Sequence, residues 1–228
     1  MNILKIFIIL TFTAALIAYT SSCENENDNG KIVYGSVKDI DGNTYKTVKI
    51  GTQLWMAENL KSTQFNDGTD ISLATNNYGW DSLSTPAYTW YNNDSISCMN
   101  TYGALYNWYT IDTLNLCPTG WHIPDTSEWN TLEAFLGGDT LAAAKLKEYG
   151  AYHWASPNSG ADNVCGFNAL PGGYLIGHFS GQSTRADWWS STEKDTRHSL
   201  GRVLYSGDFF PERSYLKTYG LSVRCIKD

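Results

Sequence analysis

Along the chain, short stretches with period-two hydrophobicity alternate with long polar stretches, which predicts small sheets joined by loops. Residues 31–40 and 44–51 are predicted as two strands. The Asp41-Gly42 pair between them is a strong signal for a hairpin turn. We expect a third short strand over residues 54–56, next to this hairpin.

Three late strands are expected at residues 188–192, 202–205 and 222–226. In the last of them, Val223 and Cys225 fall on one face, and the residues between them fall on the other. Arg202 and Arg224 lie in these strands. We expect both arginines to be partly buried and charge-paired, because a guanidinium inside a protein is well suited to an ion pair with a carboxylate.

Residues 117–138, CPTGWHIPDTSEWNTLEAFLGG, have the features of a capped helix. Asp125 is a good N-cap, and Glu128 three residues later completes the spacing of a capping box. Apolar residues then recur at helical spacing, at Trp129, Leu132, Phe135 and Leu136. Gly137 and Gly138 supply the positive φ at which helices commonly end. Two further helices are expected over residues 102–112 and 140–149.

Residues 61–100 and 150–181 have no clear period and are rich in polar, glycine and aromatic residues. Long ordered loops often carry function, so both are candidate binding regions. The candidate ligand-contact aromatics are Trp80, Trp90, Trp154 and Trp188. The alternative, left open, is that such rings only seal the loops onto the core. For Trp121, His122 and Trp129 the core interpretation is preferred, because aromatic residues at helical spacing usually pack inside.

Residues 1–22 have the form of a secretory signal, with a charged start and an apolar run too short for a comfortable membrane span. The following TSSC resembles a bacterial lipoprotein processing box, with Thr20 in place of the usual aliphatic residue. We therefore expect lipidation at Cys23, a flexible tether over residues 23–34 and a folded domain over residues 35–228. The alternative is an ordinary cysteine after a plain signal peptide. With the anchor, the predicted location is the cell envelope, with the membrane as a partner.

Composition narrows the possible partners. Hydrophobic residues make up 42% of the chain, which excludes a disordered protein. Aromatic residues make up 14%, which suits both a ring-filled fold with irregular loops and a surface that contacts carbohydrate or protein. The net charge is −7 and the sequence has no basic run, so no nucleic-acid partner is expected.

Cysteine counting predicts disulfides. Apart from Cys23, the chain has Cys98, Cys117, Cys165 and Cys225. An even number in an exported domain indicates two disulfides. Four cysteines allow three pairings and the spacing does not choose among them, while free thiols are the alternative. No CxxC spacing is present, so no structural zinc site is expected.

The sequence has no arrangement typical of a catalytic centre. The histidines, His122, His153, His178 and His198, show no HxH or HExxH spacing. No serine lies in a GxSxG elbow. The acidic run over residues 39–43 lacks the glycine and glutamate positions of an EF-hand, so a turn is preferred. We expect no catalytic residue, no metal and no cofactor.

Taken together, six stretches resemble the Fibrobacter succinogenes major paralogous domain family. They are residues 39–60, 102–109, 117–138, 166–174, 188–192 and 220–228. The stretches run in family order, cover nearly all of the chain after the tether and are specific as a set. The resemblance implies an α+β fold of the C-type-lectin-like or sulfatase-modifying-factor-like type, with short helices, small antiparallel sheets and long irregular loops. It also implies a secreted or lipid-anchored bacterial surface protein of the Bacteroidetes–Fibrobacteres group.

The resemblance further implies a Cys117–Cys225 disulfide. That leaves Cys98 and Cys165, two additions to the family pattern, which we expect to bond to each other. The related formylglycine-generating enzymes use a copper-bound cysteine pair in a late segment that this chain lacks. We therefore expect a lipid-anchored, non-enzymatic binding or adhesion module that recognises a glycan or a surface protein. The alternatives are a drifted enzyme of that class and a structural component of a surface assembly.

Overall fold

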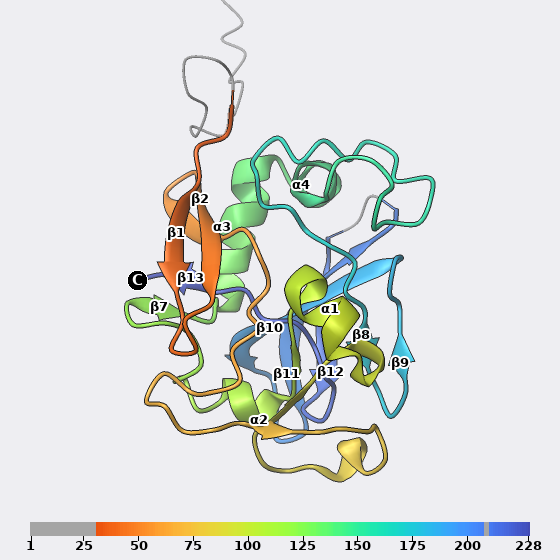
Figure 1. The fold of residues 1–228 in the computed structure, drawn as a ribbon. Coiled ribbons are helices and arrows are strands. Elements are labelled where there is room, and N and C mark those ends of the chain that lie inside the picture. The colour runs from red at the N-terminus through yellow and green to blue at the C-terminus, as the bar shows by residue number, and fades with distance from the viewer. Residues whose placement is uncertain (1–30, 208–209) are drawn as a thin grey trace, which may run out of the picture.

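The structure is a computed structural model that describes residues 31–207 and 210–228. A five-stranded antiparallel sheet has the order β1-β2-β3-β13-β7. Its strands are β1 (Gly35–Lys38), β2 (Thr44–Ile50), β3 (Gln53–Met56), β7 (Trp121–His122) and β13 (Ile226–Lys227). The predicted hairpin and third strand are confirmed, with Gly42 at φ 83° in the first turn. Since β13 lies between β3 and β7, the last strand belongs to the same sheet as the first strand, β1 (Figure 1).

A second sheet consists of three antiparallel strands, β10 (Arg185–Glu193), β11 (His198–Tyr205) and β12 (Glu212–Leu216). The first two contain predicted late strands. The sequence did not predict β12, because its first three side chains are polar and exposed and no alternation marks them. Short strands form two smaller sheets: β4 (Ser72–Leu73), β5 (Ala87–Thr89) and β6 (Leu105–Tyr106), and β8 (Tyr174–Leu175) with β9 (Phe179–Ser180).

The central helix, α3 (Thr126–Leu136), begins and ends as predicted. Glu128 N donates to Asp125 Oδ1 (2.8 Å) and Asp125 N donates to Glu128 Oε2 (2.9 Å), which completes the capping box. Gly137 ends the helix at φ 101°. The next helix, α4 (Asp139–Leu146), is shorter than predicted, because Lys147 leaves it to form a parallel bridge with Ala169.

The predicted helix over residues 102–112 is confirmed only at residues 108–111 and is wrong before them. The chain forms α1 (Ser95–Tyr102), the strand β6 and the four-residue helix α2 (Trp108–Ile111) instead. Gly103 interrupts the helical path with φ 75°. Asp94 caps α1 by accepting from Ser97 N (3.0 Å), so α1 begins inside the predicted irregular stretch. Two 3₁₀ turns, η1 (Trp80–Ser82) and η2 (Tyr91–Asn93), precede it.

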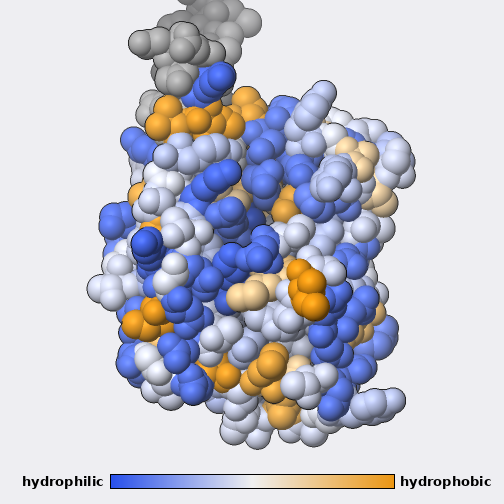
Figure 2. Space-filling model, viewed as in Figure 1, coloured by the Kyte–Doolittle hydropathy of each residue, from blue (hydrophilic) through white to orange (hydrophobic). Residues whose placement is uncertain are grey.

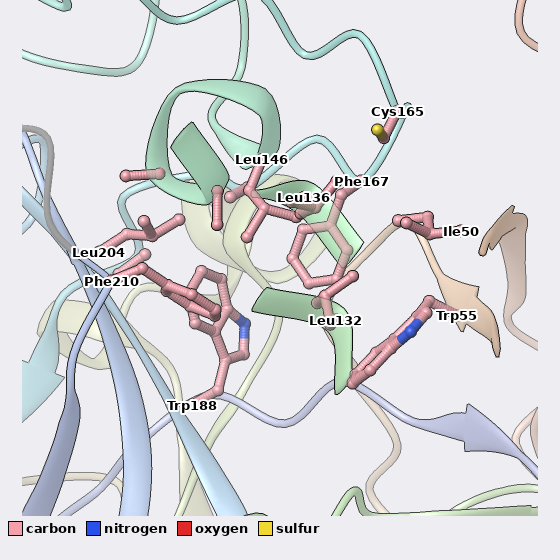
Figure 3. Close-up of a cluster of buried hydrophobic side chains, with 14 of the residues drawn as sticks. Ile50, Trp55, Leu132, Leu136, Leu146, Cys165, Phe167, Trp188, Leu204 and Phe210 are labelled. Atoms are coloured by element: carbon pink, nitrogen blue, oxygen red, sulfur yellow. The ribbon is translucent and has the colours of Figure 1, made fainter. Parts of the chain in front are cut away.

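A hydrophobic cluster packs α3 against both main sheets (Figure 3). Trp129 is fully buried there, with ring centroids 4.7 Å from Trp55, 6.1 Å from Trp188 and 5.8 Å from Phe210. Full burial of such a side chain contributes about 1.5–3 kcal/mol. The core interpretation is therefore confirmed for Trp129. Trp121 and His122, for which it was also preferred, are only half-buried on β7.

The final stretch of chain divides two clusters. Val223 and Cys225 belong to a second cluster around Tyr106, whereas Ile226 belongs to the cluster of Trp129. The predicted alternation of the last strand is confirmed, although only its end is paired as β13. The architecture of the described residues is thus α+β, with four α-helices and several small sheets, mostly antiparallel.

The predicted signal sequence and the lipidation site Cys23 lie outside the described residues. At the end of the predicted tether, Ile32 packs against the cluster of Trp129. No helix in the described ranges is both long and apolar enough to cross a membrane. The face in Figure 2 is largely hydrophilic, with hydrophobic residues in small separate patches.

Candidate functional site

A cavity of about 270 Å³ lies between the segment after β3 and the C-terminal end of α1. Its lining includes residues within 57–61 and 99–103, together with His153, Asn168 and Arg224. A single bound water needs only about 10–15 Å³ of such space. The cavity is therefore large enough for a small organic molecule, and its lining is mostly polar.

Hydrogen bonds hold the two main walls together. Asn59 Nδ2 donates to the backbone oxygen of Tyr102 (2.9 Å), and Ala104 N donates to the backbone oxygen of Leu60 (3.0 Å). Gly103 lies at this contact, and a Cβ there would stand 2.7 Å from the backbone oxygen of Leu60. Glycine is therefore needed both for the positive φ and for the close approach.

Arg224 is the most deeply buried charged group of the lining, with 1% of its surface exposed. Its guanidinium carbon lies 4.1 Å from the ring centroid of Phe167 and 5.6 Å from that of Trp188. Nε and Nη2 donate to Asn59 Oδ1 (3.2 and 2.9 Å), and Nη1 donates to the backbone oxygen of Phe167. No carboxylate within residues 31–207 and 210–228 forms an ion pair with it.

Burial removes water from the Arg224 guanidinium and lowers its pKa to about 9, while the charge of Glu58 acts in the opposite direction. This pKa remains above 7, so the guanidinium is still a cation at neutral pH. A buried cation is costly unless an anion and hydrogen bonds compensate it. Arg224 has hydrogen bonds but no contacting anion among the described residues.

The rest of the lining also favours negative charge. Lys61 adds a second cation, and its Nζ donates to Asn100 Oδ1 (2.8 Å). Glu58 is the one carboxylate among the described lining residues, and its Oε2 accepts from Lys46 N (2.7 Å). Two cations face one carboxylate here, in a chain whose net charge is −7. The charged Lys, Arg and Glu side chains of the lining therefore carry one more positive than negative charge, which favours an anionic ligand.

His153 lies at the edge of the cavity with a fixed ring orientation. Its Nδ1 lies 2.8 Å from Glu148 Oε1, and its ring makes edge-to-face contacts with Tyr102 and Tyr152. Tyr152 is 87% exposed. An exposed aromatic ring beside a polar cavity offers a flat apolar face to a ligand whose polar groups lie inside.

Comparison with protein families gives the assignment. The family model of the Fibrobacter succinogenes major domain matches residues 48–227. The chain belongs to this family. The match confirms the resemblance found in the sequence, and it includes every described lining residue of the cavity except Tyr45. No curated protein and no solved structure gave a match.

The candidate contact aromatics of this Fibrobacter succinogenes major domain are core residues. At most 5% of the surface is exposed for Trp80, Trp90, Trp154 and Trp188. Trp80 Nε1 donates to the backbone oxygen of Thr218 (2.5 Å), and Trp154 Nε1 donates to that of Ala169 (2.9 Å). The prediction that these rings contact a ligand is therefore wrong. They seal the loops onto the body, which was the alternative.

Sequence reasoning missed most of the residues that do line the cavity in this major domain. Lys61 and Thr101 lie in irregular or terminal positions without a motif of their own, and Asn59 lies in a stretch that carries the family resemblance but implies no binding role. Arg224 was noticed, but as a charge-paired residue, and that expectation is wrong. The signal that the sequence offered was Asn59, a polar residue that closely follows an apolar strand, and the structure buries it.

The Cys117–Cys225 disulfide implied by the resemblance is present in the major domain. The expected bond between Cys98 and Cys165 is not. Cys98 carries a free thiol on α1, 3.9 Å from Gln182 Nε2. The physical reason is separation, because the two cysteines lie in different hydrophobic clusters.

The acidic turn over residues 39–43 is confirmed as a turn. Asp39 Oδ1 accepts from Asn43 N (2.8 Å), and Asp39 Oδ2 accepts from the hydroxyl of Tyr45 (2.5 Å). The carboxylate therefore stabilises the hairpin itself. In the part of the chain that the structure describes, no group of three His, Cys, Asp or Glu side chains is placed to hold a metal ion.

Proposed function

We propose that this protein is a non-catalytic binding module of the cell envelope that holds a small polar part of a glycan in the cavity beside Arg224. One observation carries the proposal. The cavity contains a buried guanidinium whose charge no contacting carboxylate balances. Proteins break the ordinary rules of burial mainly at functional sites, so this cation is best explained by a ligand.

The proposed location in the cell envelope depends on the N-terminal sequence. A signal over residues 1–22 and a lipid on Cys23 would place the domain on a membrane surface, at the outer membrane or its periplasmic face. Ile32 already packs against the body, so the connection from Cys23 to the domain is short. A short connection keeps the binding module close to the membrane.

We propose for the domain a C-type-lectin-like fold. Two features support it. The C-terminal strand β13 pairs beside the N-terminal hairpin, and small sheets support long loops such as residues 61–94 and 147–173. In such an arrangement the loops are the natural binding elements, because a rigid body holds them in place. The cavity walls are built largely from loop residues.

The disulfide favours binding over a drifted formylglycine-generating activity. Copper is held by thiolates in that enzyme class, and Cys117 and Cys225 are bonded to each other. The full-length protein should therefore purify without bound copper and with this bond intact. Stoichiometric copper together with reduced Cys117 and Cys225 would contradict the proposal.

The test is a glycan array combined with a pull-down on peptidoglycan and plant polysaccharides. Asn100→Trp places a large ring at the exposed edge of the cavity, and it should weaken glycan binding at least tenfold. Leu114→Trp is the matched control, since Leu114 is 77% exposed and does not line the cavity. It should bind like the parent.

Three results would count against this proposal. A blank array and a blank pull-down with the parent protein would remove the glycan. Binding that Asn100→Trp and Leu114→Trp reduce equally, or not at all, would remove the cavity as the site. Capture of an envelope protein instead of a glycan would replace the ligand class by a protein partner.

A further inference from the structure

We propose that the ligand of this cavity carries a carboxylate, which binds the two unused N–H groups of Arg224. The inference rests on the proposed function and narrows its ligand to an acidic saccharide. The juxtaposition behind it is a buried guanidinium, without a contacting carboxylate among the described residues, in the wall of a cavity.

The donor count of Arg224 leaves room for one carboxylate. A guanidinium has five N–H donors. Two of them bind Asn59 Oδ1, and a third binds the backbone oxygen of Phe167. One N–H on each of Nη1 and Nη2 therefore has no acceptor within the described residues. Two N–H groups on these neighbouring nitrogens match the two oxygens of a carboxylate, and such charge-assisted pairs are strong.

The carboxylates of the protein that could compete are engaged elsewhere. Glu58 Oε2 accepts from Lys46 N, and the Glu148 carboxylate lies against the Nδ1 atom of His153. Neither forms an ion pair with Arg224. No carboxylate of the described residues therefore contacts Arg224, and an anion from outside can take that place. Glu58 in the same lining disfavours a doubly charged phosphate more than a singly charged carboxylate.

Other lining groups suit the hydroxyls of a sugar. Lys61 Nζ has three N–H donors and gives one to Asn100. Asn168 Nδ2 and the Thr101 hydroxyl form no hydrogen bond within the described part of the chain. The exposed ring of Tyr152 beside His153 offers an apolar surface for the face of a sugar ring.

The experiment is a calorimetric titration of the purified full-length protein with three matched probes, galacturonate, its methyl ester and galactose, and then with glucuronate, N-acetylneuraminate and inorganic phosphate. The three matched probes share one sugar frame and differ in the carboxylate. We expect galacturonate to bind at least tenfold more tightly than the other two. Arg224→Met should abolish this difference. Arg224→Lys should keep part of it, because it retains the charge without the planar fork.

Arg202→Met is the matched control, since it removes a buried arginine outside the cavity and should preserve the preference for the acid. Equal binding of acid and ester, unchanged by Arg224→Met, would overturn the carboxylate and leave the proposed function standing. Failure of galacturonate, glucuronate and N-acetylneuraminate to bind would also overturn it, and the glycan array would then decide the proposed function separately. Tighter binding of inorganic phosphate would overturn it in favour of another anion. If Arg224→Met does not fold, the test is the preference of the parent and of Arg224→Lys for galacturonate over its methyl ester.

Discussion

Two arginines on neighbouring late segments show how the same burial can have different meanings. Arg202 and Arg224 are 3% and 1% exposed, and both lie over aromatic rings. Arg202 Nη1 forms an ion pair with Glu133 of α3 (2.7 Å), and Nη2 donates to Asn130 of the same helix. Arg224 has only an amide oxygen and a backbone oxygen as acceptors among the described residues.

The difference teaches that compensation, and not burial, separates a structural arginine from a functional candidate. The ion pair of Arg202 joins β11 to α3, so its charge is balanced inside the protein, although its Nε has no hydrogen-bond partner among the described residues. Arg224 lies in a cavity wall and lacks that partner, so its charge is available to a ligand. The predictions below separate the two roles, in order of expected effect.

The largest effect concerns the segment that carries Arg224. The Cys117–Cys225 disulfide, next to Arg224, spans a sequence separation of 108, and a loop of that length contributes about 4–5 kcal/mol in the chain-entropy model. The double variant Cys117→Ala, Cys225→Ala should lose about that free energy of unfolding in urea. It should also lose carboxylate binding, because Arg224 is then held less firmly. Full binding by the double variant would show that the disulfide does not position Arg224.

Removal of the paired arginine should cost less than the disulfide. Arg202→Met leaves Glu133 without its partner, but Glu133 is 25% exposed and can still reach water. We expect a loss of about 1–3 kcal/mol, below the cost of stranding a fully buried charge. Urea denaturation of parent and variant measures it. A variant as stable as the parent would mean that the Arg202–Glu133 pair contributes nothing.

Arg224→Met should change the free energy of unfolding less than Arg202→Met does. Arg224→Met replaces an uncompensated cation by an apolar side chain of similar length, so we expect a change within about 1 kcal/mol of the parent. The comparison is between the two Met variants in the same urea titration, without ligand. If Arg224→Met is destabilised more than Arg202→Met, Arg224 is the structural residue and the contrast fails.

The charge of a third side chain, His122, changes with pH. A pH titration therefore tests how much its pairing with Asp228 and Glu128 stabilises the protein. Its Nδ1 lies 2.6 Å from Asp228 Oδ1, and its Nε2 lies 2.9 Å from Glu128 Oε1. Partial burial lowers its pKa, but the hydrogen bonds and charges of Asp228 and Glu128 outweigh burial and raise the pKa above its usual value. The stabilisation is therefore complete below the unfolded pKa of about 6.5 and is lost as pH rises through the folded pKa.

His122→Asn should remove this pH dependence. The measurement compares the free energy of unfolding of parent and variant at pH 6 and at pH 8. The parent should lose more stability than the variant on going to pH 8, and the difference should be small, because the imidazole is 41% exposed. Parallel pH profiles would show that the paired imidazole does not contribute.

Local signals in the sequence were enough to predict the capped start of α3 and the turn between β1 and β2. Asp125 and Glu128 are three residues apart and form the capping box by themselves, and Asp41-Gly42 needs only its own turn. The alternation of Val223 and Cys225 likewise follows from strand geometry. The family and the Cys117–Cys225 bond followed from a set of short motifs in a fixed order. Each of these features depends on neighbours in the chain or on the motif set.

Only the tertiary structure decided which groups are buried and which are paired. Trp154 and the exposed Tyr152 are two residues apart in one loop, yet opposite in role. Cys98 remained a thiol because its cluster is not that of Cys165. Arg202 meets Glu133 at a separation of 69 residues, and Arg224 meets Asn59 at 165. The sequence therefore determined the family and the elements that carry a local signal, whereas the cavity and its unpaired cation exist only because packing joins distant segments.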